Sequence, residues 1–111
     1  MVIERGMVCW AEPHGSGPGS RFPVVVVQAD PFNRSRIPTV LAVPLSANLR
    51  LAQAPGNVRV AGSVSGLPRD SVANVAQVVT LERRHLRPTP ARIDGELVEA
   101  IGGGLRLVLG L

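Results

Sequence analysis

The residues best suited to chemistry lie where a glycine-rich segment meets a run of valines. Residues 12–20 contain three glycines, two prolines and His14, whose imidazole ionises in the range that acid–base catalysis uses. Arg21 follows this segment, and an arginine guanidinium is a planar fork of donors that suits phosphate. Four consecutive valines come next, within 23–28. Because long connections of this kind often carry function, we expect the chemistry at this junction.

The valine run predicts a strand that is buried on both faces. Valine is stiff at χ1 and packs well on a pleated surface, and proline and asparagine bound the run on either side. Pro23 cannot donate a ladder hydrogen bond, so it suits the first position of a strand. The run is far shorter than the ~20 apolar residues that cross a membrane. We therefore expect 23–28 to be the strand around which the fold is organised.

The charge pattern favours an acidic partner. The chain has 111 residues, which we assign to one domain, 1–111, and a formal net charge of +4. All twelve basic residues are arginine, a choice that a GC-rich genome also explains. Residues 1–92 hold eleven arginines against five acidic residues, whereas 93–111 hold one against three. The sequence thus has a basic body and an acidic tail.

Cysteine usage excludes two classes of stabilisation. The single Cys9 rules out an internal disulfide, and no cysteine–histidine cluster has zinc-ligand spacing. We therefore predict no metal site and no cofactor. The chain shows no signal peptide and no segment of membrane-spanning length, which favours a cytoplasmic protein.

Turn residues divide the chain into short strands followed by one helix. Proline and glycine punctuate it throughout, and 85–91, with two prolines, is interpreted as a linker. The helix is expected over 93–108 from apolar residues at helical spacing, with Asp94 as its N-cap. Gly102, Gly103 and Gly104 each cost it about 1 kcal/mol, so it needs close packing. Strands are expected at 7–11, 23–28, 39–46, 57–62 and 71–81, with a turn or one helical turn at 47–53.

These elements predict a mainly β fold. A small, strongly bent antiparallel sheet of about five strands, closed by a C-terminal helix, is typical of an SH3-like barrel. Several motifs then resemble the MazF/PemK toxin family, in order along nearly the whole chain. They are Arg5-Gly6, Trp10, 23–28, Asp30-Pro31-Phe32-Asn33, 44–50, Pro55-Gly56-Asn57-Val58, 66–74 and 104–109.

The resemblance implies a homodimer of SH3-like barrels, the fold that MazF shares with CcdB, that cleaves single-stranded RNA. It also implies a cognate antitoxin whose disordered tail folds onto the toxin and blocks the RNA groove. In the implied reaction the ribose 2′-hydroxyl attacks the adjacent phosphate without a metal, and leaves a 2′,3′-cyclic phosphate and a 5′-hydroxyl. Such a reaction needs a base or acid near the sugar and donors around the developing charge.

The chain departs from the family pattern at the implied catalytic positions. The family usually has arginine directly before the proline of the central strand, where this chain has Phe22, and Arg21 stands one residue earlier. The family's threonine corresponds to Ser46, which keeps the hydroxyl. An aspartate of some members falls on Ala76, and His14 is displaced by two positions from a histidine or glutamate of the first loop.

From this resemblance we assign Arg21 and Ser46 as catalytic residues. RNA-binding candidates are Phe22, Asn48, Arg50, Gln77 and His14. Simpler structural roles stand beside these assignments. Ser46 suits a turn, Phe22 suits the core, Arg50 and His14 suit a solvated surface, and Trp10 suits packing or a dimer contact.

Two other functions remain open. One is a toxin of the same fold that poisons DNA gyrase, but those proteins use a C-terminal tryptophan and this chain ends Leu109-Gly110-Leu111. The other is a catalytically weakened family member that mainly binds RNA or its antitoxin. The phenylalanine at position 22 is the reason to keep this second alternative.

Overall fold

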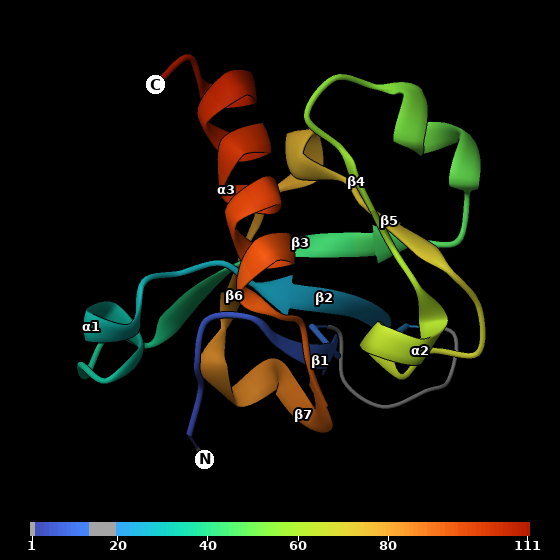
Figure 1. The fold of residues 1–111 in the computed structure, drawn as a ribbon. Coiled ribbons are helices and arrows are strands. Elements are labelled where there is room, and N and C mark those ends of the chain that lie inside the picture. Colours follow the sequence, from blue (N-terminus) through green and yellow to red (C-terminus); the bar gives the residue numbers. More distant parts are fainter. Residues whose placement is uncertain (1, 14–19) are drawn as a thin grey trace.

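The computed structural model describes residues 2–13 and 20–111, which form one curled antiparallel sheet crossed by a C-terminal helix (Figure 1). The mainly β class with a C-terminal helix is confirmed, with seven strands among the described residues instead of about five. The strands are β1 (Met7–Ala11), β2 (Phe22–Val26), β3 (Thr39–Ser46), β4 (Val58–Val60), β5 (Ser71–Ala73), β6 (Val79–Glu82) and β7 (Leu86–Arg92). The helices are α1 (Asp30–Asn33), α2 (Gly62–Ser65) and α3 (Gly95–Leu109), with 3₁₀ turns η1 (Leu49–Gln53), η2 (Val75–Gln77) and η3 (Arg83–His85).

Strand β3 is the spine of the sheet. The strand order is β4-β5-β3-β2-β1-β7, and β6 also pairs with β3. The first half of β3, 39–42, pairs with β6, and its last two residues, 45–46, pair with β5. Strand β3 is long enough to pair with both β6 and β5. The sheet bends around β3 and forms a half-closed barrel.

The expected single strand over 71–81 is wrong. The chain leaves β5 after Ala73, makes the 3₁₀ turn η2, and returns as β6. The turn is held by Asn57, whose side chain accepts a hydrogen bond from the Val75 N–H at 2.9 Å. Weak alternation alone did not reveal this interruption, because the apolar residues continue through it.

The linker expected at 85–91 is also wrong, because this segment is strand β7. It pairs with β1 at the edge of the sheet, with Cys9 opposite Pro88. An edge strand needs ladder donors on one side only, and it can therefore hold prolines. The Thr89 hydroxyl donates to the Val8 carbonyl at 2.8 Å and adds a further tie between the two strands.

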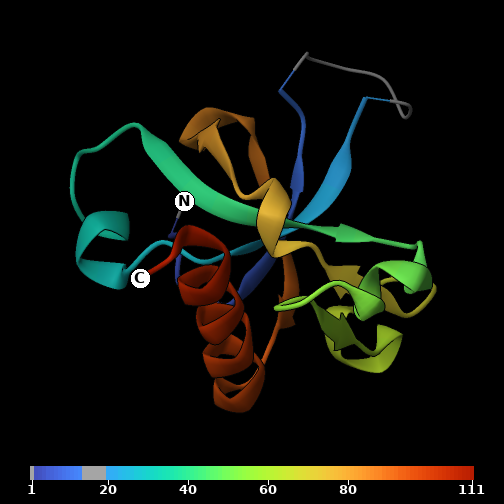
Figure 2. The ribbon, with the colours of Figure 1, turned by 90° about the horizontal axis from the view of Figure 1, so that it is seen from above.

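The valine strand is buried on both faces, as predicted. Val24 and Val26 belong to one apolar cluster, and Val25 belongs to the cluster beneath α3. The strand starts at Phe22, one residue before Pro23, and ends at Val26. Figure 2 shows strands β1 and β2 rising away from α3.

The predicted C-terminal helix is present as α3, over 95–109 instead of 93–108, and it is held by a close approach of two glycines. Asp94 is its N-cap and accepts a hydrogen bond from the Leu97 N–H at 2.9 Å. Gly104 is buried against the backbone of Gly56, which has a φ of +87°. The glycines therefore weaken the helix locally and permit its packing. No helix among the described residues has the length and apolar character needed to cross a bilayer.

Asp30 ties α1 to the N-terminal segment. Its carboxylate accepts hydrogen bonds from the Arg5 N–H at 2.8 Å and the Asn33 amide at 3.0 Å. The Arg5 N–H most of all, and then Asn33, hold the pKa of Asp30 below its usual 3.8. A lowered folded-state pKa stabilises the fold above the unfolded pKa, and this contribution is lost as pH falls through the folded value.

Asp30→Asn is therefore expected to flatten the dependence of stability on pH in acid. At neutral pH the free energy of unfolding should fall by about 1 kcal/mol, since a hydrogen bond to a charged group is lost. Below about pH 4 the difference between the variant and the wild type should shrink, because the wild-type carboxylate becomes protonated. Urea unfolding at several pH values measures this. A difference that stays constant down to pH 2–3 would contradict the assignment.

Candidate active site

Arg21 lies over the ring of Trp10, just beyond the last pair of the β1–β2 ladder, Ala11 with Phe22. The strand register pairs Trp10 with Pro23, so residue 21 comes within reach of the indole. The Arg21 Cζ lies 4.1 Å from the ring centroid, within the range of a cation–π contact. The side chain is exposed. The stack thus gives an accessible guanidinium a defined direction.

A cleft of about 320 Å³ lies beside this stack. Trp10 and Pro23 form one wall, and the loop 67–71 forms the other, with Leu45 and Ala47 between them. A second hollow on the other side of Leu67 and Pro68 also reaches Trp10. The indole is therefore the shared wall of two grooves, and this arrangement can hold a flat ring next to an arginine.

Asp70 supplies a fixed negative charge to the cleft. Its carboxylate accepts hydrogen bonds from the Gly62 N–H at 2.8 Å and from the Arg59 guanidinium at 3.0 Å. The Gly62 N–H first, and then Arg59, lower the pKa of Asp70 below 3.8. It is ionised at neutral pH and forms an ion pair with Arg59, which offsets its charge, and it can still accept a hydrogen bond from a base edge.

Phe22 and Ser46 lie on the opposite face of the sheet from the stack. Phe22 packs against the apolar cluster that contains Val24. Leu45 belongs to the cluster beneath α3, and successive strand residues point to opposite faces, so Ser46 faces the Phe22 side. Its hydroxyl accepts the Asn48 N–H at 3.2 Å. Among the described residues no hydrogen bond joins Arg21 to Ser46.

The remaining candidates are dispersed. Asn48 is the N-cap of η1 and accepts a hydrogen bond from the Arg50 N–H at 3.2 Å. Arg50 is exposed on η1, and Gln77 is exposed at the end of η2. None of these three lines the Trp10 cleft. His14 lies outside the described residues.

Sequence reasoning missed Trp10 and the loop 67–71 as parts of a site. The signal for Trp10 was available, because a predicted hairpin between 7–11 and 23–28 already places residue 10 near residue 21. The loop carried only turn chemistry in its sequence, and nothing in that pattern indicated that it would fold back over Trp10. The fold of the sheet is what brings these segments together.

Comparison with known proteins places the chain clearly. The family model of the PemK-like, MazF-like toxin of type II toxin-antitoxin system matches residues 4–109. Endoribonuclease MazF6 of Mycobacterium tuberculosis is 43% identical over 114 residues, which cover 100% of both chains. Endoribonuclease EndoA of Bacillus subtilis is 30% identical over 114 residues, covering 100% of this chain and 97% of its own length.

Solved structures agree with the sequence comparison. A mycobacterial endoribonuclease in complex with its cognate antitoxin has a TM-score of 0.79 and 25% identity, and covers 98% of this chain and 96% of that one. MazF from Deinococcus radiodurans has a TM-score of 0.78 at 18% identity, covering 100% and 99%, and so shares the fold.

Proposed function

Since this chain belongs to the family of PemK-like, MazF-like toxins of type II toxin–antitoxin systems, we propose that it is an endoribonuclease that cleaves single-stranded RNA and thereby inhibits translation and growth. The single observation that supports the proposal on this chain's own residues is the exposed Arg21 guanidinium, aligned on Trp10 beside a cleft. An arginine next to an aromatic face suits the phosphate and the base of one nucleotide.

The proposed reaction is an internal transfer at phosphorus. The ribose 2′-oxygen loses its proton, forms a bond to the adjacent phosphorus, and the bond to the 5′-oxygen of the next nucleotide breaks. The products are a 2′,3′-cyclic phosphate and a 5′-hydroxyl, which takes up a proton. Arg21 would stabilise the negative charge that develops on the phosphoryl oxygens. Ser46, on the Phe22 face of the sheet, would donate a hydrogen bond to RNA phosphate there.

RNA-binding roles for the other candidates extend the proposal. Asn48 caps η1 and Arg50 lies on it, shortly after β3, where they would meet nucleotides next to the cleaved bond. Gln77 would contact a base from η2, Phe22 would stack on a base, and His14 would act from the first loop. Aromatic stacking and arginine contacts are the usual means of holding single-stranded RNA.

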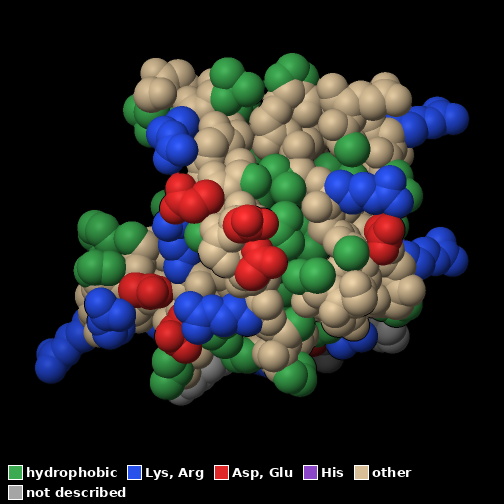
Figure 3. All heavy atoms as spheres, viewed as in Figure 1, with side chains coloured by type: hydrophobic (Ala, Val, Ile, Leu, Met, Phe, Trp, Pro, Cys, Tyr) green, Lys and Arg blue, Asp and Glu red, His purple; other side chains and the backbone are tan. Residues whose placement is uncertain are grey.

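We also propose a cognate antitoxin, a homodimer and a cytoplasmic site of action. The basic body of the chain suits an acidic antitoxin segment. Large apolar side chains are exposed at the end of α3, among them Leu107 at 61% and Leu109 at 57%, and on β3 at Leu41. Figure 3 shows hydrophobic side chains at the top of the molecule, over this end of α3. These positions would be covered in a dimer.

A second candidate function is that of a weakened family member that mainly binds RNA or antitoxin. The observation in its favour is that Phe22, in the family's arginine position, shares a face with Ser46, whereas Arg21 lies on the other face. Losing a charge-stabilising group in a site of this kind costs about 2.7–4 kcal/mol of barrier. The active endoribonuclease and the weakened family member predict different effects of the Phe22→Arg substitution on the cleavage rate.

Phe22→Arg is expected to bring no gain in the cleavage rate per folded molecule at saturating RNA, since Arg21 already supplies the charge. The variant should lose about 1–2 kcal/mol of stability, because a half-buried aromatic ring leaves the core. Cleavage of a single-stranded RNA and thermal unfolding, measured on the same preparations, check both statements. A rise in rate of tenfold or more would favour the weakened-member alternative.

A cell-free translation reaction tests the proposed function as a whole. When the purified chain is added, the mRNA should be shortened before the protein output falls. The Arg21→Ala variant, added at the same concentration, should leave both unchanged. A fall in output while the mRNA stays intact would overturn the proposal in favour of inhibition by binding.

A further inference from the structure

A larger cleft lies at the other end of β3, away from Trp10. It has a volume of about 980 Å³ and is formed by three segments, residues 2–3, 33–38 and 82–84. Residue 39 begins β3 beside this cleft, and residue 46 ends the strand near the candidate active site. An eight-residue strand spans about 25 Å at its usual rise, so the two sites are well separated on one molecule.

Four arginines line this cleft with little to neutralise them. Arg84 pairs with Glu82 at 2.9 Å. Within 2–13 and 20–111, no ion pair involves Arg34, Arg36 or Arg83. The Arg83 guanidinium donates to the Ile37 carbonyl at 3.2 Å, which fixes its position but leaves its charge uncompensated. The cleft is therefore a concentrated positive site with an apolar floor.

An exposed aromatic ring lies on α1, close in sequence to Arg34 and Arg36. Phe32, on α1, is 58% exposed, and it comes two residues before Arg34. Figure 3 shows basic side chains projecting at the left of the molecule, over the lobe that carries α1, with hydrophobic side chains beside them. Aromatic rings interleaved with arginines form the stacking and phosphate contacts that bind single-stranded nucleic acid. An acidic peptide would not need the ring.

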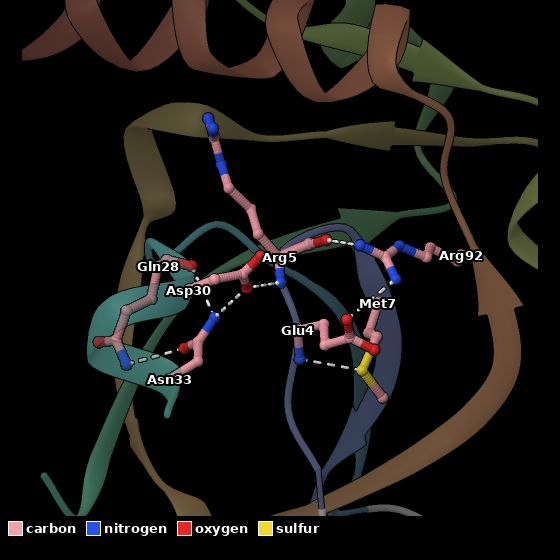
Figure 4. Close-up of polar contacts among 7 residues, drawn as sticks. All are labelled: Glu4, Arg5, Met7, Gln28, Asp30, Asn33 and Arg92. Carbon is pink, nitrogen blue, oxygen red and sulfur yellow. Dashed lines mark hydrogen bonds and ion pairs between the residues drawn. The ribbon is translucent and has the colours of Figure 1, made fainter. Parts of the chain in front are cut away.

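The platform that carries Phe32 is held rigidly. Asn33 is 4% exposed; its amide donates to the Gln28 carbonyl at 2.8 Å and to Asp30 at 3.0 Å. Figure 4 shows this network continuing from Asp30 to Arg5, and from the Arg5 carbonyl to Arg92. Because Asp30 and Asn33 tie α1 to Arg5 and Gln28, the backbone that carries Phe32 is held in place. Such preorganisation lowers the cost of binding.

We propose that the α1 corner, defined as Phe32, Arg34, Arg36 and Arg83, is a second binding site for single-stranded RNA, remote from the bond that is cut. Phe32 stacks on a base, and the three arginines contact phosphates. The identity of the ligand as substrate RNA rests on the proposed function. A strand long enough to reach both sites binds more tightly than one that fills the active site alone.

Fluorescence anisotropy with an uncleavable probe tests the corner directly. The probe is a labelled 2′-O-methyl RNA of about fifteen nucleotides, a length within the range of single-strand sites. Arg36→Ala and Arg106→Ala form a matched pair, because both remove one exposed arginine and Arg106 lies on α3. We expect Arg36→Ala and Phe32→Ala each to weaken binding by roughly tenfold, and Arg106→Ala by less than about twofold. The double variant Arg34→Ala/Arg36→Ala should reduce the steepness with which log K for RNA binding falls with log salt concentration, by about 1.4.

Cleavage of a short oligonucleotide separates this proposal from the proposed function. An RNA of about five nucleotides fills only the active site, so wild type and corner variants should cut it equally. If the wild type cuts no RNA but its RNA binding still depends on Phe32 and Arg36, the α1 corner is supported as a binding site and the proposed function is wrong. Equal weakening by Arg36→Ala and Arg106→Ala would overturn the corner. The proposal would also be overturned if the Arg36→Ala and Phe32→Ala variants bound RNA as tightly as the wild type, while Arg36→Ala weakened the binding of polyglutamate.

Discussion

Arg21→Ala is expected to lower the rate of RNA cleavage by about 10²–10³-fold, the usual effect of removing one donor from a charge-stabilising site. The guanidinium is exposed and lies 4.1 Å above the Trp10 ring, so its loss should not disturb the core. Single-turnover cleavage of a defined RNA, with thermal unfolding as a check on folding, measures the effect.

Two further substitutions show whether the arginine acts through its charge and its shape. Arg21→Lys keeps the charge but lacks the planar fork, so it should recover only part of the rate. Ser46→Ala should cost less than about tenfold, because the hydroxyl already accepts the Asn48 N–H as a turn residue does. An Arg21→Ala rate within a few-fold of the wild type would remove Arg21 from the mechanism.

Gly104→Ala is expected to destabilise the fold by about 2–3 kcal/mol, although alanine is the better helix former. A Cβ at this position would collide with the Gly56 carbonyl oxygen and would lie 2.9 Å from the Gly56 carbonyl carbon. Both contacts are with backbone, which cannot turn away as a side chain does. For a domain of this size the melting temperature should fall by about 10 °C.

Gly103→Ala is the matched control one residue earlier. Its Cβ would meet only the end of the Arg106 side chain, at 3.8 Å. This variant should therefore gain up to about 1 kcal/mol from helix propensity. Equal effects of the two substitutions, measured by urea unfolding, would mean that α3 does not pack on Gly56 as the structure has it.

The parts of the fold that the sequence revealed are those with a strong local pattern. Strands 7–11 and 39–46 were predicted with the boundaries they have, and Asp94 was identified as the cap of the C-terminal helix. Strand β7 was missed because Pro88 and Pro90 argue against a strand unless it lies at an edge. Whether a strand is at an edge depends on the whole sheet, which no local pattern contains.

The candidate site was predictable only in its individual residues. Position 21 was identified from its place before the valine strand, but its partner Trp10 comes from pairing across the hairpin. The separation of Arg21 from Ser46 follows from side-chain alternation on β2 and β3, which the sequence also contains. Which of the two faces a residue occupies depends on which side of the sheet α3 covers. The packing of α3 over the sheet is not contained in the sequence pattern of β2 or β3.

The most direct test of the account is to incubate the purified chain with a long single-stranded RNA in EDTA and to map the fragment ends. We expect discrete cuts that leave 2′,3′-cyclic phosphate and 5′-hydroxyl ends. Intact RNA in the presence of folded protein, or cuts that require added metal and leave 3′-hydroxyl ends, would contradict it.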